Sequence, residues 1–392
     1  MVGILTFHWA DDCGGMLQAY ALKRQLELLG EEAEIIPYAP VKLTGRYWVC
    51  PVCAERRREG LHYFLYRYML ARYLAMGGAY WRRRRRMRAF RRTYLTACPP
   101  IRRAADISLL PYRTVFVGSD QVWNPDITVD LDDAYVGNIP RRGACRLAAY
   151  AASLGGTSLG PEDREKFAKY VGGGFSAVSL REQTDAEQVE KLTGRPVRDV
   201  LDPVLLLDRE EWEGLARPPA EGDAVVLYTT QPNGDLLRRA RALSDCLGKR
   251  IVSLSRPDLL AEDPGDLEGI RMEPACGPGE FLGWIQSACC VLTNSFHATA
   301  FSVLLEKPFL SFRHSARGVR QSDLLSKLGL LSLLWEPGRE EENVWAETDW
   351  AEVRGRLAEE RAASRRFMME NLGTEDQEEA YGEDHFNHCS RL

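Results

Sequence analysis

The stretch T-N-S-F-H-A-T-A-F, residues 293–301, organises the second half of the chain. A short apolar run at 288–292 precedes it and predicts a buried strand, and a helical pattern follows as far as Glu306. We therefore expect a strand-to-helix turn, with Asn294 or Ser295 as the helix N-cap. Backbone N–H groups at such a turn favour anions, so His297 in the first helical turn is a candidate acid or base. The alternative is a capped helix whose histidine is satisfied inside the core.

The composition is that of a globular protein with more than one core. The chain has 392 residues, of which 45% are hydrophobic and 27% charged, so two domains are expected. The net charge of −5 gives no general attraction to nucleic acid. No run approaches the roughly 18 apolar residues of a membrane span, and the N-terminus enters a strand without the basic segment of a signal peptide. The ten scattered cysteines suit reduced thiols, which predicts a cytoplasmic protein.

Strand-like and helix-like segments alternate in two series separated by a linker at 217–222. The first series has apolar runs at 2–8, 33–38, 114–117, 146–152, 175–180 and 198–201, with a loop at 11–15 before the first helix. The second has runs at 223–229, 250–254, 288–292 and 309–312. This rhythm predicts two Rossmann-like lobes facing across a cleft, at 1–216 and 223–335. Residues 336–392 should form an acidic segment, a C-terminal helix and a tail.

Residues 40–100 break this rhythm and are expected to form a helical insert. They contain Cys50-Pro-Val-Cys53 and an arginine run at 82–86, followed by Arg88, Arg91 and Arg92. The C-x-x-C pair lacks a second pair at zinc spacing, so a metal site is the weaker interpretation. The arginine run is either a solvated helix face or, with its aromatic neighbours, a contact for anionic lipid or a polyanion.

Polar residues follow several of the predicted strands, as expected where strand ends line a crevice. Each of them could instead serve only as a helix cap or a turn, and Asp202-Pro203 could be no more than a turn. These strand-end residues are Ser119, Asp120, Asn124, Arg181 and Glu182, and Gln18 lies in the first turns of the first helix.

An ordered set of motifs resembles the polysaccharide pyruvyl transferase family over about residues 1–335. The motifs are G-I-L-T-F-H at 3–8, G-G-M-L-Q-A-Y-A-L at 14–22, V-G-S-D-Q-V-W-N at 117–124, A-Y-A-A-S-L-G at 149–155, S-L-R-E-Q at 179–183, L-D-P at 201–203, T-N-S-F-H-A-T-A-F-S at 293–302 and K-P-F at 307–309. The loop at 11–15 departs from the Asn-Gly turn expected there. The resemblance implies a GT-B-like arrangement of the two lobes, with phosphoenolpyruvate as donor and a sugar as acceptor.

The resemblance also assigns roles to individual residues. Arg181 matches the family's donor-binding arginine, and the basic residue after K-P-F maps to Arg317, with Arg320 as its rival. A doubly anionic donor needs several cations, and Arg313 is a further candidate. His297 would protonate the enol carbon, as the family's S-F-H histidine implies, and Asp120 is our candidate base for the attacking hydroxyl.

The remaining expectations concern the acceptor and the alternatives. Arginine and histidine can carry the anion charge, so no metal or other cofactor is expected. A lipid-linked acceptor would bring the protein to the inner face of a membrane as a peripheral partner. A nucleotide-sugar glycosyltransferase of the same architecture is the first alternative, with Glu306 as a weak candidate for binding ribose. A non-enzymatic component of a polysaccharide assembly complex is the second. Six further residues are candidate substrate-binding or supporting groups: Ser119, Gln18, Asn124, Glu182, Asn294 and Ser295.

Overall fold

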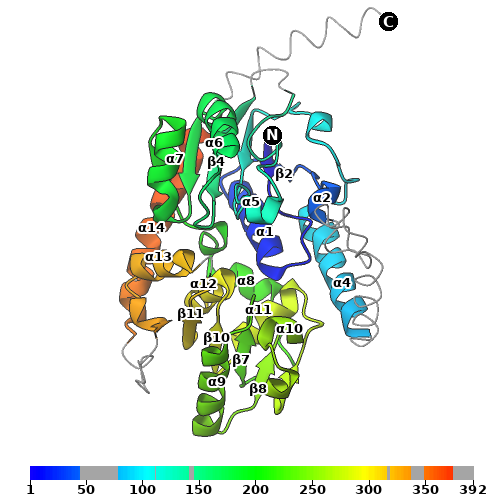
Figure 1. Ribbon diagram of the computed structural model, residues 1–392, viewed down its shortest axis with the longest axis vertical. Helices are drawn as coiled ribbons and strands as arrows, with labels where there is room; N and C mark the ends of the chain where they lie inside the picture. The colour runs from blue at the N-terminus through cyan, green and yellow to red at the C-terminus, as the bar shows by residue number, and fades with distance from the viewer. Residues whose placement is uncertain (45–77, 111, 141–144, 316–317, 337–347, 374–392) are drawn as a thin grey trace, which may run out of the picture.

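A computed structural model describes residues 1–44, 78–110, 112–140, 145–315, 318–336 and 348–373. It contains two six-stranded sheets, each built entirely of parallel strands (Figure 1). The first sheet has the order β2-β1-β3-β4-β5-β6 and the second has the order β12-β11-β10-β7-β8-β9. The topology confirms two Rossmann-like lobes in the GT-B-like arrangement that the sequence predicted.

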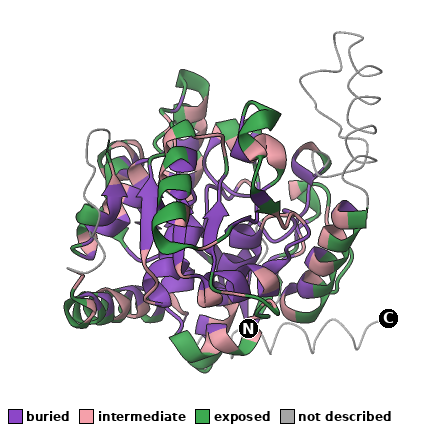
Figure 2. Ribbon diagram, turned by 90° about the horizontal axis from the view of Figure 1, so that it is seen from below, coloured by how far each residue is buried: buried purple, intermediate pink, exposed green. Residues whose placement is uncertain are grey.

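The strands are short apolar runs buried on both faces, as parallel sheets require. The first sheet contains β1 (Val2–Leu5), β2 (Ala33–Ile35), β3 (Thr114–Val117), β4 (Arg146–Ala152), β5 (Ala177–Leu180) and β6 (Val197–Asp199). The second contains β7 (Val225–Tyr228), β8 (Ile251–Ser253), β9 (Ile270–Met272), β10 (Cys290–Thr293), β11 (Phe309–Phe312) and β12 (Leu334–Trp335). Figure 2 shows both sheets buried beneath helices whose outer faces are exposed.

Helices cover the sheets and connect consecutive strands. In the first lobe they are α1 (Cys13–Leu28), α2 (Val41–Thr44), α4 (Gly78–Phe90), α5 (Pro125–Thr128), α6 (Pro161–Phe167) and α7 (Ala186–Thr193). Helix α8 (Arg209–Leu215) leads to the second lobe, which contains α9 (Gly234–Leu247), α10 (Pro257–Leu260), α11 (Pro278–Ser287), α12 (Phe296–Leu304) and α13 (Val319–Lys327). The expected loop at 11–15 is shorter than predicted, because α1 already begins at Cys13 after the N-cap Asp12.

The C-terminal helix α14 (Trp350–Asn371) returns to the first lobe instead of standing apart. The Ser364 hydroxyl accepts a hydrogen bond from the Leu201 amide at 2.9 Å, and the Thr114 hydroxyl donates to the Asn371 carbonyl at 3.2 Å. Figure 1 shows α14 running alongside both lobes. The helix is therefore anchored on the first lobe by hydrogen bonds near both Thr114 and Leu201.

The hydrophobic core continues across the junction between the lobes. Trp212 of α8 packs edge-on against Phe301 of α12, with ring centroids 4.9 Å apart, and Phe301 also contacts Phe281 of α11. All three side chains are fully buried. Because burying aromatic side chains is a large part of core stability, this cluster fixes α12 between the two sheets.

Part of the predicted insert is described and is helical. Helix α4 continues into one π-helical turn, η3 (Arg91–Leu95). The pair Cys50 and Cys53, the aromatic stretch up to residue 77 and the acidic segment at 337–347 lie outside the described residues. Within the described residues, no helix has both the length and the apolar character needed to cross a membrane.

Candidate functional site

The site lies where both sheets change winding direction. In the first sheet the chain runs from β1 outward to β2 and then returns to β3 on the other side of β1; in the second it does the same from β7 to β10. Ligands of parallel α/β sheets bind beyond the carboxyl ends of strands at such points. Asp12 and Asp120 follow β1 and β3, and Thr229 and Asn294 follow β7 and β10. All four line one cavity between the lobes.

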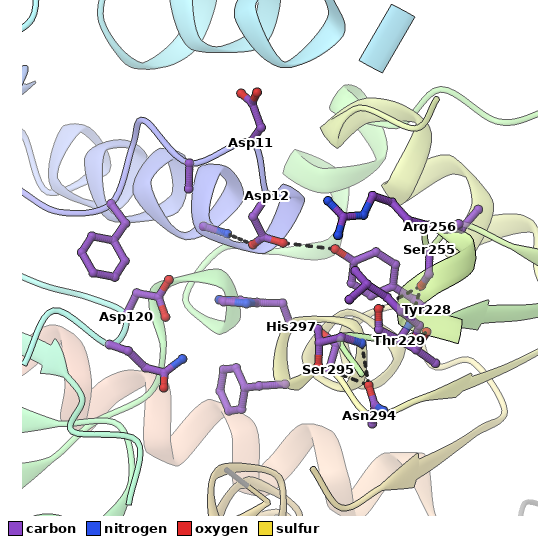
Figure 3. Close-up of a pocket in the computed structure, with 18 of the residues that line it drawn as sticks. Asp11, Asp12, Asp120, Tyr228, Thr229, Ser255, Arg256, Asn294, Ser295 and His297 are labelled. Atoms are coloured by element: carbon purple, nitrogen blue, oxygen red, sulfur yellow. Dashed lines mark hydrogen bonds between the residues drawn. The ribbon is translucent and has the colours of Figure 1, made fainter. Parts of the chain in front are cut away.

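This cavity has a volume of about 490 Å³, which falls within the range of small-molecule sites. Its walls come from both sheets and from the insert helix α4. Figure 3 shows His297 reaching from the second lobe toward the side of the pocket formed by Asp12 and Asp120. The lining residues used below are Trp9, Asp12, Tyr80, Arg83, Arg84, Asp120, Ser295, Phe296, His297 and Arg320.

The strand-to-helix turn has the predicted form. Strand β10 ends at Thr293, and Ser295 is the N-cap of α12, with its hydroxyl accepting from the Ala298 amide at 3.5 Å. The first N–H groups of a helix have no acceptor within it, so this end of α12 carries partial positive charge. Asn294 is held by the neighbouring loop, since its Oδ1 accepts from the Thr230 amide at 2.7 Å. The turn therefore presents a fixed, anion-favouring surface to the cavity.

His297 is 7% exposed and stands at the junction of the lobes. Its Nε2 is buried and lacks a hydrogen-bond partner among the described residues, and lies 3.8 Å from Oδ2 of Asp202. That distance is too long for a hydrogen bond but short enough for an ion pair with a protonated imidazole. An orphaned buried nitrogen at a cavity wall is a group that a bound ligand or water would satisfy. The interpretation of His297 as a histidine satisfied within the core is therefore not supported.

Arg181 and His297 share the same carboxylate. Nη1 of Arg181 donates to Oδ2 of Asp202 at 2.7 Å, and Nη2 donates to Oδ1 of Asp120 at 2.8 Å. The Arg181 guanidinium also lies over the Phe296 ring, 4.8 Å from its centroid, in cation–π contact. The sequence offered Asp202 as part of the L-D-P motif after a predicted strand, or as no more than a turn. The residue is buried and also accepts from the Ser119 hydroxyl at 3.1 Å. Asp202 is thus the centre of the polar network.

Charge within the network is set by burial and by these partners. Burial raises the pKa of Asp120, but Arg181, His297 and Arg320 outweigh that effect and hold the pKa below its ordinary value. Asp120 is therefore ionised at neutral pH. Burial raises the pKa of Glu182 to about 7, against the lowering effect of Arg181. The pKa values of these two carboxyl groups beside one arginine are therefore shifted in opposite directions.

The other candidate residues fall into three groups. Arg320, Asn294 and Ser295 line the cavity together with His297 and Asp120. Arg313 points away to Glu336 at 3.5 Å with its side chain 51% exposed, and Arg317 lies outside the described residues. Glu306 pairs with Arg354 at 2.7 Å and is not among the described lining residues. Five candidates are buried behind the described cavity wall and support it: Gln18, Ser119, Asn124, Arg181 and Glu182.

The buried supports hold the loops that follow the strands. Nε2 of Gln18 donates to the Gly15 carbonyl at 2.9 Å and to the Thr6 hydroxyl at 3.0 Å, which fixes the turn after β1. Asn124 caps α5 by accepting from the Asp126 amide at 2.9 Å. Their predicted contact with substrate therefore has no support in the geometry, and their observed role is to position the pocket wall.

Sequence reasoning missed the contribution of α4 to the pocket. Tyr80, Arg83 and Arg84 line the cavity, although the arginine run gave no signal beyond its charge. Nη1 of Arg83 donates to the Cys276 carbonyl of the second lobe at 2.9 Å, and Nη2 donates to the Asp11 carbonyl of the first at 3.2 Å. The helix therefore bridges both lobes at the edge of the site.

Gly14 supplies a close approach that no larger residue could make. A Cβ built on Gly14 would lie 2.2 Å from Nδ1 of His297, whereas one on the adjacent Gly15 would have no neighbour closer than 3.6 Å. We expect Gly14→Ala to displace the imidazole and lower turnover about 10- to 100-fold, because small misplacements of a reacting group are costly. Gly15→Ala is the matched control and should stay within about three-fold of wild type. Equal turnover by the two variants would show that the position of the imidazole is not critical.

The fold and the pocket define a two-lobed α/β protein with a small-molecule cavity between its lobes. The sequence matches the model of the polysaccharide pyruvyl transferase family over residues 12–316, and the chain belongs to this family of transferases. This confirms the resemblance seen in the motifs.

Several solved structures are distantly similar to this chain. A UDP-GlcNAc 2-epimerase from Neisseria meningitidis bound to UDP-GlcNAc has 10% identity and a TM-score of 0.47, with 95% of this chain and 98% of that chain covered. A putative UDP-N-acetylglucosamine 2-epimerase from Listeria monocytogenes also has 10% identity and a TM-score of 0.47, with coverages of 93% and 90%. The heptosyltransferase WaaC of E. coli with ADP has 11% identity and a TM-score of 0.38, with coverages of 82% and 90%. No curated protein sequence matches the chain significantly.

Proposed function

We propose that this protein transfers the pyruvyl group of phosphoenolpyruvate to two hydroxyls of a sugar in a polysaccharide or lipid-linked oligosaccharide, forming a cyclic ketal and releasing phosphate. The observation that carries the proposal is the position of His297. Its orphaned Nε2 faces a carboxylate that is itself bound by Arg181, at the wall of a cavity shared by both lobes. An acid beside an anion-favouring helix start suits protonation of a phosphorylated enol.

The donor requires positive charge at two places, since it carries a phosphate and a carboxylate. The start of α12 supplies backbone N–H groups and a partial positive charge. Arg320 is 8% exposed, lines the cavity and lies near the same Phe296 ring, with its guanidinium carbon 5.8 Å from the centroid. An arginine fork matches either anion of the donor. Donor binding between α12 and Arg320 is the simplest arrangement that uses both features.

The reaction then needs one acid and one base. A proton passes from His297 to the methylene carbon of the donor, and the neighbouring carbon becomes an oxocarbenium-like centre. A sugar hydroxyl adds to that centre and gives its proton to Asp120, which is ionised and lines the same cavity. A second hydroxyl then forms the other C–O bond of the ketal at that carbon, while the C–O bond to phosphate breaks. Phosphate leaves with the bonding electron pair, and the proton of the second hydroxyl returns to His297. This chemistry requires no metal, because arginine, histidine and the helix start balance the anion charge.

The acceptor would occupy the side of the cavity toward the first lobe. Trp9 and Tyr80 line that region, and aromatic faces of this kind suit contact with a sugar ring. A lipid-linked acceptor would require the protein to work at the inner face of a membrane as a peripheral partner. The acceptor sugar itself is the unknown that a screen would identify.

The proposal is tested by measuring phosphate release from phosphoenolpyruvate with a panel of sugar and lipid-linked acceptors. We expect Arg320→Ala to raise the KM for phosphoenolpyruvate at least about ten-fold, because a charge-assisted contact to an anion is lost. Arg313→Ala is the matched control, since Arg313 is half-exposed and points at Glu336, and its KM should change less than about two-fold.

Two outcomes would contradict the proposal. Release of a nucleoside diphosphate from a nucleotide sugar, with no phosphate from phosphoenolpyruvate, would indicate a glycosyltransferase. Absence of turnover with every donor, together with recovery of the protein in a polysaccharide assembly complex, would indicate a structural component.

A further inference from the structure

Helix α4 has two faces with different chemistry. Tyr80, Met87 and Phe90 are buried on the inner face, which also carries the cavity residues Arg83 and Arg84. The opposite face is exposed. It carries one tryptophan and several arginines, most of them three, four or seven residues apart, so that they lie on one side of the helix. This row of side chains extends into η3. Its members are Trp81, Arg82, Arg85, Arg88 and Arg92. These five residues are called the outer stripe below.

Two other arginines, Arg86 and Arg91, attach the helix to the two lobes. Nη1 of Arg86 donates to the Ala275 carbonyl at 2.8 Å, and its Nε lies 3.1 Å from a Glu280 carboxylate oxygen, both in the second lobe. Nε of Arg91 donates to the His8 carbonyl at 2.9 Å, and its Nη2 donates to the Trp9 carbonyl at 2.8 Å, in the first lobe. The position of α4 is therefore fixed by one set of arginines, and the outer stripe takes no part in it.

Within the described part of the chain, the arginines of the outer stripe have no acidic partner. Among the described residues no carboxylate lies within ion-pair distance of Arg82, Arg85, Arg88 or Arg92, although most other exposed arginines of the chain have one nearby, as in the pair Arg238–Asp235. The whole chain carries a net charge of −5, so this face is positive against its surroundings. Trp81 lies at the start of the stripe, is 60% exposed and makes an edge contact with Tyr80.

We propose that the outer stripe is a docking surface for an anionic membrane. Arginines on one face of a helix are attracted to acidic headgroups, and tryptophan is the side chain that settles at the headgroup level of a bilayer. An exposed tryptophan among the arginines suits the headgroup level of a bilayer better than an extended polyanion. The complementary charge and the exposed indole are thus both accounted for by one partner.

Docking through this face would also orient the pocket. The inner face of the same helix lines the cavity with Tyr80, Arg83 and Arg84, so the edge of the cavity would lie close to the headgroup layer. This orientation suits an acceptor sugar that is attached to a membrane lipid and reaches the pocket alongside α4. That identification of the acceptor rests on the proposed function. Membrane binding itself does not depend on that function.

The test is co-sedimentation of the full-length protein with vesicles of phosphatidylcholine alone or mixed equally with phosphatidylglycerol. We expect wild-type protein to bind the mixed vesicles at low salt and to be released as salt rises. The double variant Arg85→Glu/Arg88→Glu should bind at least about ten-fold more weakly, because two attractive charges become repulsive. Trp81→Ala should bind several-fold more weakly and lose its residual binding at lower salt than wild type.

The control is Arg238→Glu/Arg366→Glu, which makes the same charge change at exposed positions of α9 and α14. It should bind within about two-fold of wild type, since net charge alone is not the cause. The proposal is overturned if the α4 double variant binds like wild type, if wild type binds both vesicle types equally, or if it binds neither. Stronger binding to heparin or RNA than to the mixed vesicles, unaffected by Trp81→Ala, would also overturn it and assign the stripe to another polyanion.

A second measurement separates this proposal from the proposed function. Phosphate release with a water-soluble sugar acceptor should be the same for wild type and the α4 double variant, because neither substituted residue lines the cavity. Vesicle binding without any phosphate release by wild type would leave docking intact and count against pyruvyl transfer. Normal phosphate release without vesicle binding would leave pyruvyl transfer intact and count against membrane docking.

Discussion

Replacing His297 with asparagine should lower turnover at least about 1,000-fold while leaving the fold intact. Asparagine fills similar space and keeps hydrogen-bonding capacity, but it cannot deliver a proton, and general acid catalysis contributes on the order of 10²–10⁴-fold. Since the start of α12 and Arg320 are unchanged, the affinity for phosphoenolpyruvate should fall less than about ten-fold. Steady-state phosphate release gives the first quantity, and calorimetric titration with the donor gives the second.

The matched control for this variant is His314→Asn. His314 also lines the cavity from the second lobe, but it is partly exposed and lies outside the Arg181–Asp202 network. Its replacement should leave turnover within about ten-fold of wild type. A His297→Asn enzyme that turns over like wild type, with an unchanged melting temperature, would remove His297 from the mechanism.

Replacing Arg181 with methionine should destabilise the protein by about 3–5 kcal/mol. The side chain is fully buried, and its removal leaves Asp120 and Asp202 as buried carboxylates without their shared cation. Urea unfolding would measure the loss. Arg181→Lys keeps the charge but lacks the two Nη groups that donate separately to Asp202 and Asp120, so its loss should be intermediate.

The matched control is Arg24→Met at the surface. Arg24 also donates two hydrogen bonds to a carboxylate, here both to Glu211, but the two side chains are 35% and 29% exposed, so less than about 1 kcal/mol should be lost. Equal losses from the two variants would contradict the account of Arg181 as the buried centre of the charge network. The prediction that Arg181 also contacts the donor would need a separate measurement of donor affinity in the lysine variant.

Local signals in the sequence were sufficient to predict the strand-to-helix turn of α12. An apolar run, a serine with N-cap chemistry and a histidine one turn into the helix all lie within a few residues of one another. The alternating strands and helices likewise predicted both lobes. The predicted ends of the strands before Asp120 and Asn294 agree closely with the structure, and these two residues line one cavity together with His297.

The features that were missed depend on contacts between distant parts of the chain. Asp202 belonged to the L-D-P motif, but the sequence assigned it no role in the site, because that role comes from its contacts with Arg181, Ser119 and His297. The position of α4 is set by carbonyl groups of both lobes, one of them 193 residues away from Arg83. Composition and periodicity carry no information about such contacts between distant residues. The sequence therefore showed that the arginine run is positively charged, but not where it lies relative to the two lobes.

The central claim is that His297 delivers a proton to the donor and that a pyruvyl ketal is the product. The most direct measurement is mass spectrometry of the acceptor after reaction with phosphoenolpyruvate in D₂O, with wild type and His297→Asn compared side by side. The account predicts that wild type forms a pyruvylated acceptor with one solvent-derived deuterium in its methyl group, and that the variant forms essentially none. The same deuterated product from both proteins at equal rates, or an acceptor that has gained a sugar instead, would contradict it.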